Sequence, residues 1–172
     1  MKALHYCSSM GALLLVALLS SGALGGEVYA HDVEVAVGNV PENILQAAKA
    51  AFPGKFSKYI SAEKRTIDKK IVHYSIELKL KDKTSVDAYF SEDAKLLRTG
   101  VTVDAANVPA PVRAAFQKAY GDWTVTDLNK ETDATTKVEV YSVDINKSGK
   151  MLEVDFAPDG TVVKTLELRD ND

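Results

Sequence analysis

Cysteine is nearly absent from this sequence: Cys7 is the only one in 172 residues. It precedes the apolar run at 10–19, whereas the cysteine of a lipoprotein follows such a run at the cleavage point. A chain that begins after residue 30 therefore has no thiol, which excludes disulfides, a thiol nucleophile and a zinc–thiolate site from it. Its stability must come from a hydrophobic core.

Histidine is also scarce, with three in the whole chain. After residue 30 only His31 and His73 remain, and neither lies in a motif that pairs a base with a nucleophile. No block of basic residues occurs and the formal net charge is −3, so we expect no nucleic-acid partner. We predict a protein that is not an enzyme and that has no cofactor and no metal site.

The first thirty residues have the pattern of a secretory signal peptide. Lys2 precedes the apolar run at 10–19, small residues follow, and Val28-Tyr29-Ala30 fits the specificity of signal peptidase. Ten apolar residues are fewer than the ~20 that a membrane-spanning helix requires, which argues against a retained anchor. We predict cleavage after Ala30, a periplasmic or secreted location, and no membrane contact after cleavage.

The rest of the sequence contains one pattern twice. Asn39-Val40-Pro41 recurs as Asn107-Val108-Pro109, and such residues favour the start of a helix. Each copy continues with the i, i+3, i+4, i+7, i+8 apolar spacing of an amphipathic helix. The apolar positions are Ile44, Ala47, Ala48, Ala51 and Phe52 in the first copy, and Val112, Ala115, Phe116, Ala119 and Tyr120 in the second. Each copy is therefore predicted to begin with a helix.

Strand patterns follow each helix in the same order. Tyr74-Ser75-Ile76-Glu77-Leu78 corresponds to Tyr141-Ser142-Val143-Asp144-Ile145, and a turn and a second matching strand follow each of them. Apolar and polar residues alternate, as is typical of a strand with one buried face. Each copy has about four strands, because first strands are expected at 58–67 and 125–131 and last strands at 96–103 and 162–168.

We therefore predict an α+β fold of two tandem units, each an N-terminal helix packed on an antiparallel meander sheet of about four strands. The predicted boundaries are 1–30 for the signal peptide, 31–104 for the first unit and 105–172 for the second. In each unit the helix covers the apolar face of the sheet, which leaves the polar face to solvent or to a partner.

The two helices differ at one position of the apolar stripe. Ala48 in the first copy corresponds to the much larger Phe116 in the second. The first core must therefore be filled from elsewhere, and we expect Phe56 or Tyr59 on the following strand to supply the volume.

The ordered motifs resemble the PepSY-like domains over residues 39–168. They are Val-Pro before the helix, an alanine-rich helix that ends in Phe52-Pro53-Gly54, the Tyr-Ser strand, and Val154-Asp155-Phe156 followed by Asp159-Gly160. PepSY-like domains are grouped with the β-lactamase inhibitory protein, which is also a tandem of helix-plus-sheet units. The resemblance implies periplasmic, non-enzymatic binding or inhibition. Ile60 and Leu128 replace the Trp of many such repeats and the inhibitor's disulfides are missing, so lactamase specificity is not carried over.

The polar strand faces supply the candidate binding residues. We expect the two sheets to lie side by side as a polar platform that contacts another protein, as an inhibitor or an accessory factor. His73 is expected to be solvated on this face. The residues expected at the contact are His73, Glu77, Tyr89, Ser142, Asp144, Glu153 and Asp155.

The acidic residues of the second unit leave alternatives open. Asp144, Glu153 and Asp155 share one strand face, and carboxylates that approach across a hairpin can bind a divalent cation or act as an acid–base pair. A small-ligand or divalent-cation sensor is therefore the alternative function, and a carboxylate-dependent hydrolase is the third. The same residues are also consistent with a solvated polar face that binds nothing and whose charge is neutralised by nearby lysines.

Overall fold

The computed structural model describes residues 29–67 and 70–169. The predicted signal peptide lies outside the described residues, except for Tyr29 and Ala30, and Ala30 is the first residue of a strand. The cleavage site therefore stays a prediction.

The described chain contains the repeated order of helix and strands that the sequence predicts. The first half comprises β1 (Ala30–Glu34), α1 (Glu42–Ala51), β2 (Phe56–Ile67), β3 (Lys70–Leu80), β4 (Ser85–Phe90) and β5 (Leu96–Thr102). The second half comprises α2 (Ala110–Tyr120), β6 (Thr124–Asp133), β7 (Glu139–Lys147), β8 (Lys150–Phe156) and β9 (Val162–Leu168). A short 3₁₀ helix precedes each α-helix, at Val37–Asn39 and Ala105–Asn107. The strand β1 was not predicted.

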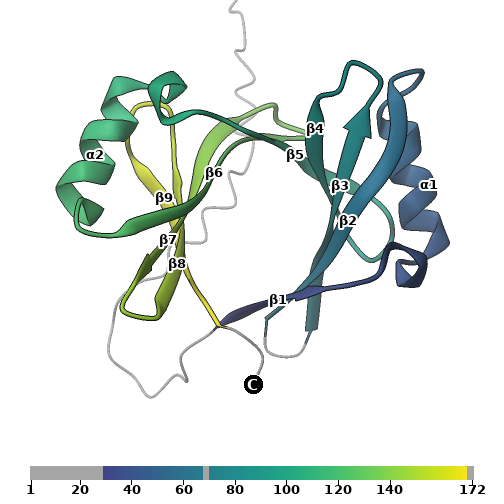
Figure 1. Cartoon of the computed structure of the whole chain (residues 1–172), viewed down its shortest axis with the longest axis horizontal. Coiled ribbons are helices and arrows are strands. Elements are labelled where there is room, and N and C mark those ends of the chain that lie inside the picture. The colour runs from purple at the N-terminus through teal and green to yellow at the C-terminus, as the bar shows by residue number, and fades with distance from the viewer. Residues whose placement is uncertain (1–28, 68–69, 170–172) are drawn as a thin grey trace, which may run out of the picture.

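The nine strands form one closed barrel in sequence order (Figure 1). Strand β5 pairs with β6, with Arg98 opposite Asp133 at one end and Thr102 opposite Asn129 at the other. Strand β1 pairs antiparallel with β2 and, through Ala30 and Leu168 alone, parallel with β9. The predicted fold class, two units that each have their own four-stranded sheet, is therefore wrong. Joining the two strand sets removes the sheet edges, whose unpaired backbone groups would otherwise need solvent or a partner chain.

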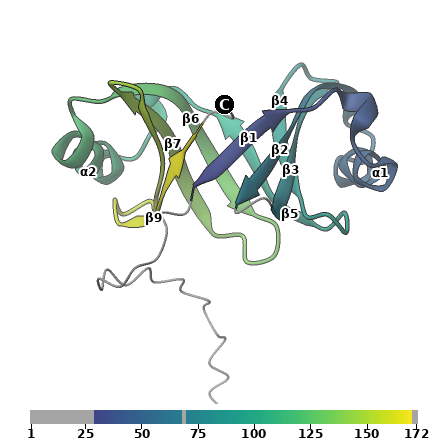
Figure 2. The ribbon, with the colours of Figure 1, turned by 90° about the horizontal axis from the view of Figure 1, so that it is seen from below.

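The two helices cover opposite outer sides of the barrel (Figures 1 and 2). Under α1, Ile44 and Ala48 are fully buried against the strands, together with Ile76, Leu78 and Phe90. Under α2 the corresponding core contains Val112, Val143, Ile145, Val154 and Phe156. The apolar stripes are thus confirmed, except that Ala119 is exposed.

The predicted difference between the two cores is also confirmed. Phe56 and Tyr59 pack against the first core, with ring centroids 4.8 Å apart. The Tyr59 hydroxyl donates to the backbone carbonyl of Leu45 at 2.7 Å, which fixes the ring beneath α1. In the second core Phe116 itself packs against Phe156, with ring centroids 6.4 Å apart.

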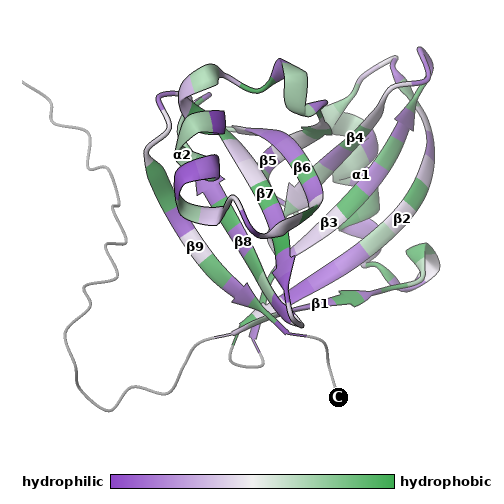
Figure 3. Ribbon diagram, turned by 60° about the vertical axis from the view of Figure 1, so that its left-hand side comes forward, coloured by the Kyte–Doolittle hydropathy of each residue, from purple (hydrophilic) through white to green (hydrophobic). Residues whose placement is uncertain are grey.

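The strands carry their apolar residues toward the helices and their polar residues into the barrel. Figure 3 shows this alternation as successive hydrophilic and hydrophobic bands along each strand. The expectation of an outward, solvated polar platform is therefore wrong, because helices occupy the outer face and a strand has only two faces. His73, Ser142, Glu153 and Asp155 are at most 8% exposed.

Candidate functional site

The inward polar residues line a cavity of about 350 Å³. Side chains from strands β1 to β8 form its wall, so both halves of the barrel contribute to it. One guanidinium group, from Arg65, faces eight carboxyl groups in this lining. The carboxyl groups belong to Asp32, Glu63, Glu77, Asp87, Asp127, Glu131, Asp144 and Glu153. The cavity is therefore strongly acidic.

The residues predicted for a protein contact come together at this cavity rather than on an outer surface. Six of them line it, namely His73, Glu77, Tyr89, Ser142, Asp144 and Glu153. Asp155 is buried on β8 directly opposite Ser142. Their role in binding stays a prediction, whereas solvation is contradicted for His73, Ser142, Glu153 and Asp155, which are buried, and Glu77, Tyr89 and Asp144 are half-buried.

One side of the cavity is neutralised by a network of ion pairs around Glu153. The Arg65 guanidinium donates to both oxygens of Asp32, at 2.7 and 2.6 Å, and also to Glu153. Lys164 on β9 donates to Glu153 as well. Burial alone would raise the pKa of Glu153, but Arg65 and Lys164 outweigh it and lower that pKa to about 2. Arg65 thus connects β2 to β8 across the β1–β9 junction.

The β5–β6 junction has a second ion pair inside the barrel. Arg98 Nε lies 3.0 Å from a carboxylate oxygen of Glu131, and the Arg98 guanidinium lies 4.3 Å from the centre of the Tyr89 ring. His73 meets the same ring edge-on, with ring centroids 5.3 Å apart. Burial, assisted by the charges of Arg98 and Arg65, lowers the pKa of His73 to about 3. His73 is therefore a buried neutral residue, and the predicted solvated histidine is wrong.

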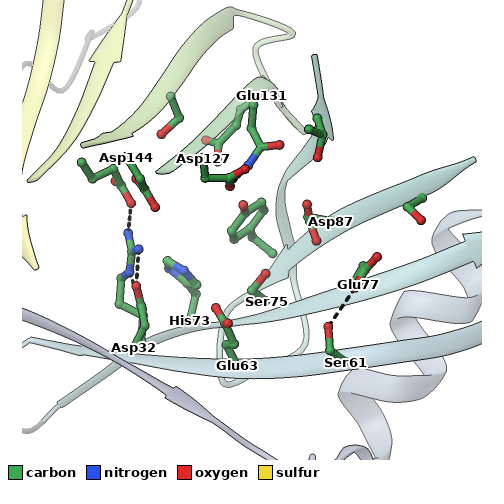
Figure 4. A pocket seen from close by; sticks show the side chains of 17 residues that line it. Asp32, Ser61, Glu63, His73, Ser75, Glu77, Asp87, Asp127, Glu131 and Asp144 are labelled. Carbon is green, nitrogen blue, oxygen red and sulfur yellow. Dashed lines mark hydrogen bonds and ion pairs between the residues drawn. The ribbon is translucent and has the colours of Figure 1, made fainter. Parts of the chain in front are cut away.

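Five carboxyl groups of the cavity form no ion pair with a lysine or arginine among the described residues: Glu63, and four that form two pairs on neighbouring strands. Glu77 lies opposite Asp87 on β3 and β4, and Asp127 lies opposite Asp144 on β6 and β7. Figure 4 shows all four around the same space. The hydrogen bonds of the two pairs are with neutral groups only, from Ser61 to Glu77 at 3.0 Å and from the Asn129 amide to Asp127 at 2.6 Å.

The crowding of these acids changes their protonation. Burial, then the charges of Glu77 and Asp127, raise the pKa of Asp87 to about 7. Burial, then the charge of Glu153, raise the pKa of Asp144 to about 7, and Arg65 only partly opposes this shift. Near neutral pH both side chains therefore hold a proton for part of the time, in a space where a bound cation would displace it.

A buried amide also lacks a partner at this site. Asn129 is 8% exposed and its Oδ1 atom has no hydrogen-bond donor, although its Nδ2 atom donates to Asp127. A buried polar atom without a partner costs about 1–3 kcal/mol, so a donor brought by a ligand would be favourable there. Among residues 29–67 and 70–169, no three His, Asp or Glu side chains have the arrangement of a metal site.

Sequence reasoning missed Arg65, Asn129 and Glu131 as parts of the site. Arg65 falls on a predicted strand at an inward alternate position, so the period of two could have identified it. Its partner could not be identified in this way, because Arg65 meets Glu153 only when the barrel closes.

Comparisons with known proteins identify the repeat. The family model described as "Putative beta-lactamase-inhibitor-like, PepSY-like" matches residues 26–98 and again 98–164. Two successive matches show a tandem repeat and confirm the PepSY-like resemblance. No curated protein sequence matches the chain.

Several solved structures with a similar fold come from Bacteroides species. A BLIP-like protein of Bacteroides fragilis is 21% identical, with a TM-score of 0.52 over 77% of this chain and 89% of that one. A protein of Bacteroides eggerthii described among "putative periplasmic proteins" is 17% identical, with a TM-score of 0.52 over 76% and 90%. A DUF2874 family protein of Bacteroides uniformis is 15% identical, with a TM-score of 0.51 over 74% and 88%. At these identities the likeness shows the fold. In the described part of this chain, no helix has the length and apolar character needed to cross a bilayer.

Proposed function

The chain belongs to the PepSY-like family, and on that premise we propose that it is a non-catalytic binding module whose ligand is a cation held inside the barrel. The observation that carries this proposal is the charge of the cavity, where eight carboxyl groups have only three cationic partners among the described residues, Arg65, Arg98 and Lys164. Like charges repel more strongly in an enclosed, partly desolvated space than in bulk water. A bound cation would relieve that repulsion.

The acidic charge is accessible from solvent. Glu63 and Asp127, both in the cavity lining, are exposed, whereas Glu131 and Glu153 at the same cavity are buried. The lining thus changes from an open acidic rim to a closed end that holds the ion pairs. Such a rim attracts cations and raises their local concentration.

A non-catalytic role is supported by the description of the family, which is inhibitor-like and names no enzyme. It is also supported by the state of His73, because a neutral imidazole with a pKa of about 3 is a poor base at neutral pH. The carboxylate-dependent hydrolase has no further observation in its favour, and we do not propose it.

Contact with another protein, in an inhibitory or accessory role, is the second candidate function. The name of the Bacteroides fragilis relative, a BLIP-like protein, favours it. In this chain the sheet faces expected at such a contact are turned inward, so a partner would have to present a basic segment to the rim at Glu63 and Asp127. In both candidate functions the acidic rim binds a cationic group. The group belongs to a free solute in the first and to a partner protein in the second.

We also propose a periplasmic or secreted location. The signal-peptide pattern supports it, as does the periplasmic description of the Bacteroides eggerthii relative. The expected outcome is that mass spectrometry of the exported protein finds His31 at the N-terminus, with β1 shortened by the loss of Ala30. A full-length product in the cytoplasm would contradict it.

Calorimetry on the purified chain tests the cationic site. We expect at least one member of a panel of metal ions, amines and a lysine-rich peptide to bind, and the matching anions not to bind. The double variant Glu77→Gln/Asp127→Asn should weaken that binding, whereas Glu92→Gln, which removes one exposed charge in the β4–β5 turn, should not. Absence of binding by every cation to the folded chain would overturn the proposal. A pull-down from periplasmic extract with the same variants distinguishes a basic protein from a free solute.

A further inference from the structure

The duplicated acids of the cavity indicate which cation it takes. We propose that the ligand is a small organic dication, with two ammonium or guanidinium groups on a short chain, bound between two carboxylate pairs. This inference rests on the proposed function and specifies its ligand. One pair is Glu77 with Asp87 from the first half, and the other is Asp127 with Asp144 from the second half.

One member of each pair arises from the repeat, whereas the other member does not, because Asp87 corresponds to Glu153 and Asp127 to Ser61. Glu77 and Asp144 occupy the same position of the Tyr-Ser strand motif, and each lies opposite a second carboxyl group on a neighbouring strand. Both pairs line the same cavity, and they approach it from different strands (Figure 4). Duplication of one unit has therefore placed two anionic positions around one space, and a ligand with two cationic ends matches that arrangement.

The two pairs are not explained by the needs of folding. Like charges directly opposite each other on neighbouring strands destabilise a sheet. Glu131 and Glu153 are held by Arg98, Arg65 and Lys164, but within residues 29–67 and 70–169 no lysine or arginine forms an ion pair with either of the two carboxylate pairs. Burial raises the pKa values of Asp87 and Asp144, and neighbouring carboxylates raise them further, chiefly Glu77 for Asp87 and Glu153 for Asp144.

A second observation at the same place calls for a hydrogen-bond donor. The Oδ1 atom of Asn129 is buried and unpartnered, and the same side chain donates to Asp127. A primary ammonium group has three N–H donors, so it can bind Asp127, Asp144 and the Asn129 oxygen together. The buried amide oxygen and the unneutralised acids thus call for the same chemical group.

The size and form of the cavity favour an organic molecule over a bare ion or a protein segment. About 350 Å³ lies within the range of small-molecule sites, whereas one water molecule occupies only ~30 Å³ in the liquid. The absence of a metal-type cluster among the described residues agrees with a ligand whose charges are spread apart. Ion pairs cross both junctions of the barrel, from Arg65 to Glu153 and from Arg98 to Glu131, which restricts the room for a polypeptide loop.

Calorimetry with putrescine and butylamine tests the proposal on the full purified chain, dialysed first against high salt to remove any retained ligand. The two probes share one four-carbon chain and differ by one ammonium group. We expect putrescine to bind at least about tenfold more tightly, as one added charge-assisted hydrogen-bonded contact implies. Asp87→Asn and Asp144→Asn should each reduce the affinity for putrescine toward that for butylamine.

The variants have internal controls. Asparagine has the shape of aspartate, and thermal melts should show both variants folded and at least as stable as the parent, because each removes a repelled charge. Glu92→Gln, in the exposed β4–β5 turn, should bind putrescine as the parent does. Equal affinity for the two amines, or parental putrescine affinity in both Asp variants, would overturn the proposal.

Further outcomes separate this inference from the function on which it rests. Binding of calcium or a lysine-rich peptide in place of putrescine, sensitive to Glu77→Gln/Asp127→Asn, would overturn the dication and support the acidic site. Failure of every cation to bind would overturn both.

Discussion

The two halves of the barrel carry equivalent inward carboxyl groups that have opposite electrostatic environments. Asp87 lies opposite Glu77 in the first half, and Glu153 lies opposite Asp144 in the second, so Asp87 and Glu153 occupy matching positions. Glu153 has two cationic partners and a pKa of about 2, whereas Asp87 has none and a pKa of about 7. The repeat therefore determines where the acids stand, and the few cations determine which of them are neutralised.

The cations are unequally shared between the halves. Arg98 lies opposite Tyr89 in the first half, as Lys164 lies opposite Asp155 in the second. Arg98 interacts with Tyr89 and Glu131, whereas Lys164 and Arg65, which comes from the first half, both form ion pairs with Glu153. The second half thus has two cations at one acid, whereas the two carboxylate pairs have none among the described residues.

Removal of Arg65 should have the largest effect of the changes considered. Arg65→Met leaves Glu153 with Lys164 alone and leaves Asp32 without its partner. Loss of one member of a buried ion pair typically costs about 3–5 kcal/mol, and we expect a loss of that size in the free energy of unfolding. Urea melts measure it. A loss below about 1 kcal/mol would show that the junction of the halves does not depend on this residue.

Truncation in the core tests the second difference between the halves. Phe116→Ala should lower the free energy of unfolding by about 2–3 kcal/mol, less than for a fully buried ring because Phe116 is half-buried. The reciprocal change Ala48→Phe should cost about 1–3 kcal/mol, since Phe56 and Tyr59 already fill that space. Urea melts that show no loss for Ala48→Phe would mean that the first core has unfilled room.

Neutralisation of Glu153 should destabilise the protein. Glu153→Gln keeps the shape of the side chain but weakens its bonds to Arg65 and Lys164, for an expected loss of about 2 kcal/mol at neutral pH. The pKa of Glu153 is depressed on folding, so this contribution is present above its unfolded pKa and is lost as pH falls through about 2. Urea melts of the parent and the variant at pH 7 and pH 3 check it, and a variant as stable as the parent at pH 7 would contradict it.

Neutralisation of the matching Asp87 should have a smaller effect of opposite sign. Folding raises the pKa of Asp87, so the folded chain binds more protons than the unfolded chain between about pH 4 and pH 7, and its stability falls as pH rises through that window. Asp87→Asn should therefore gain about 1 kcal/mol at pH 8, because the solvent that reaches the cavity screens part of the repulsion, and almost nothing at pH 4. Thermal melts at the two pH values decide the sign, and a destabilised variant at pH 8 would refute the comparison.

The sequence was sufficient for the local structure but not for the closure of the barrel. The helix stripes, the two faces of the strands and the repeat follow from spacing, and β9 has the predicted bounds. Alternation shows that a strand has a polar face, but it does not show whether that face contacts water or the polar faces of other strands inside a barrel. Closure depends on β1 and on the β5–β6 pairing. Backbone hydrogen bonds form this pairing, so the residue types in the sequence do not reveal it. His73, Asp144 and Glu153 were therefore assigned to the right face and the wrong environment.

The titration of Asp87, followed by carboxyl carbon NMR with and without putrescine, tests whether the interior of the barrel is an unneutralised cation site. In the free chain Asp87 should titrate near 7, while Glu153 stays ionised down to about pH 2. Saturating putrescine should lower the pKa of Asp87 and leave that of Glu153 unchanged, because only Asp87 gains a cationic partner. The proposed cation site would be contradicted if Asp87 titrated near 4 in the free protein, or if its pKa did not change when a cation was bound.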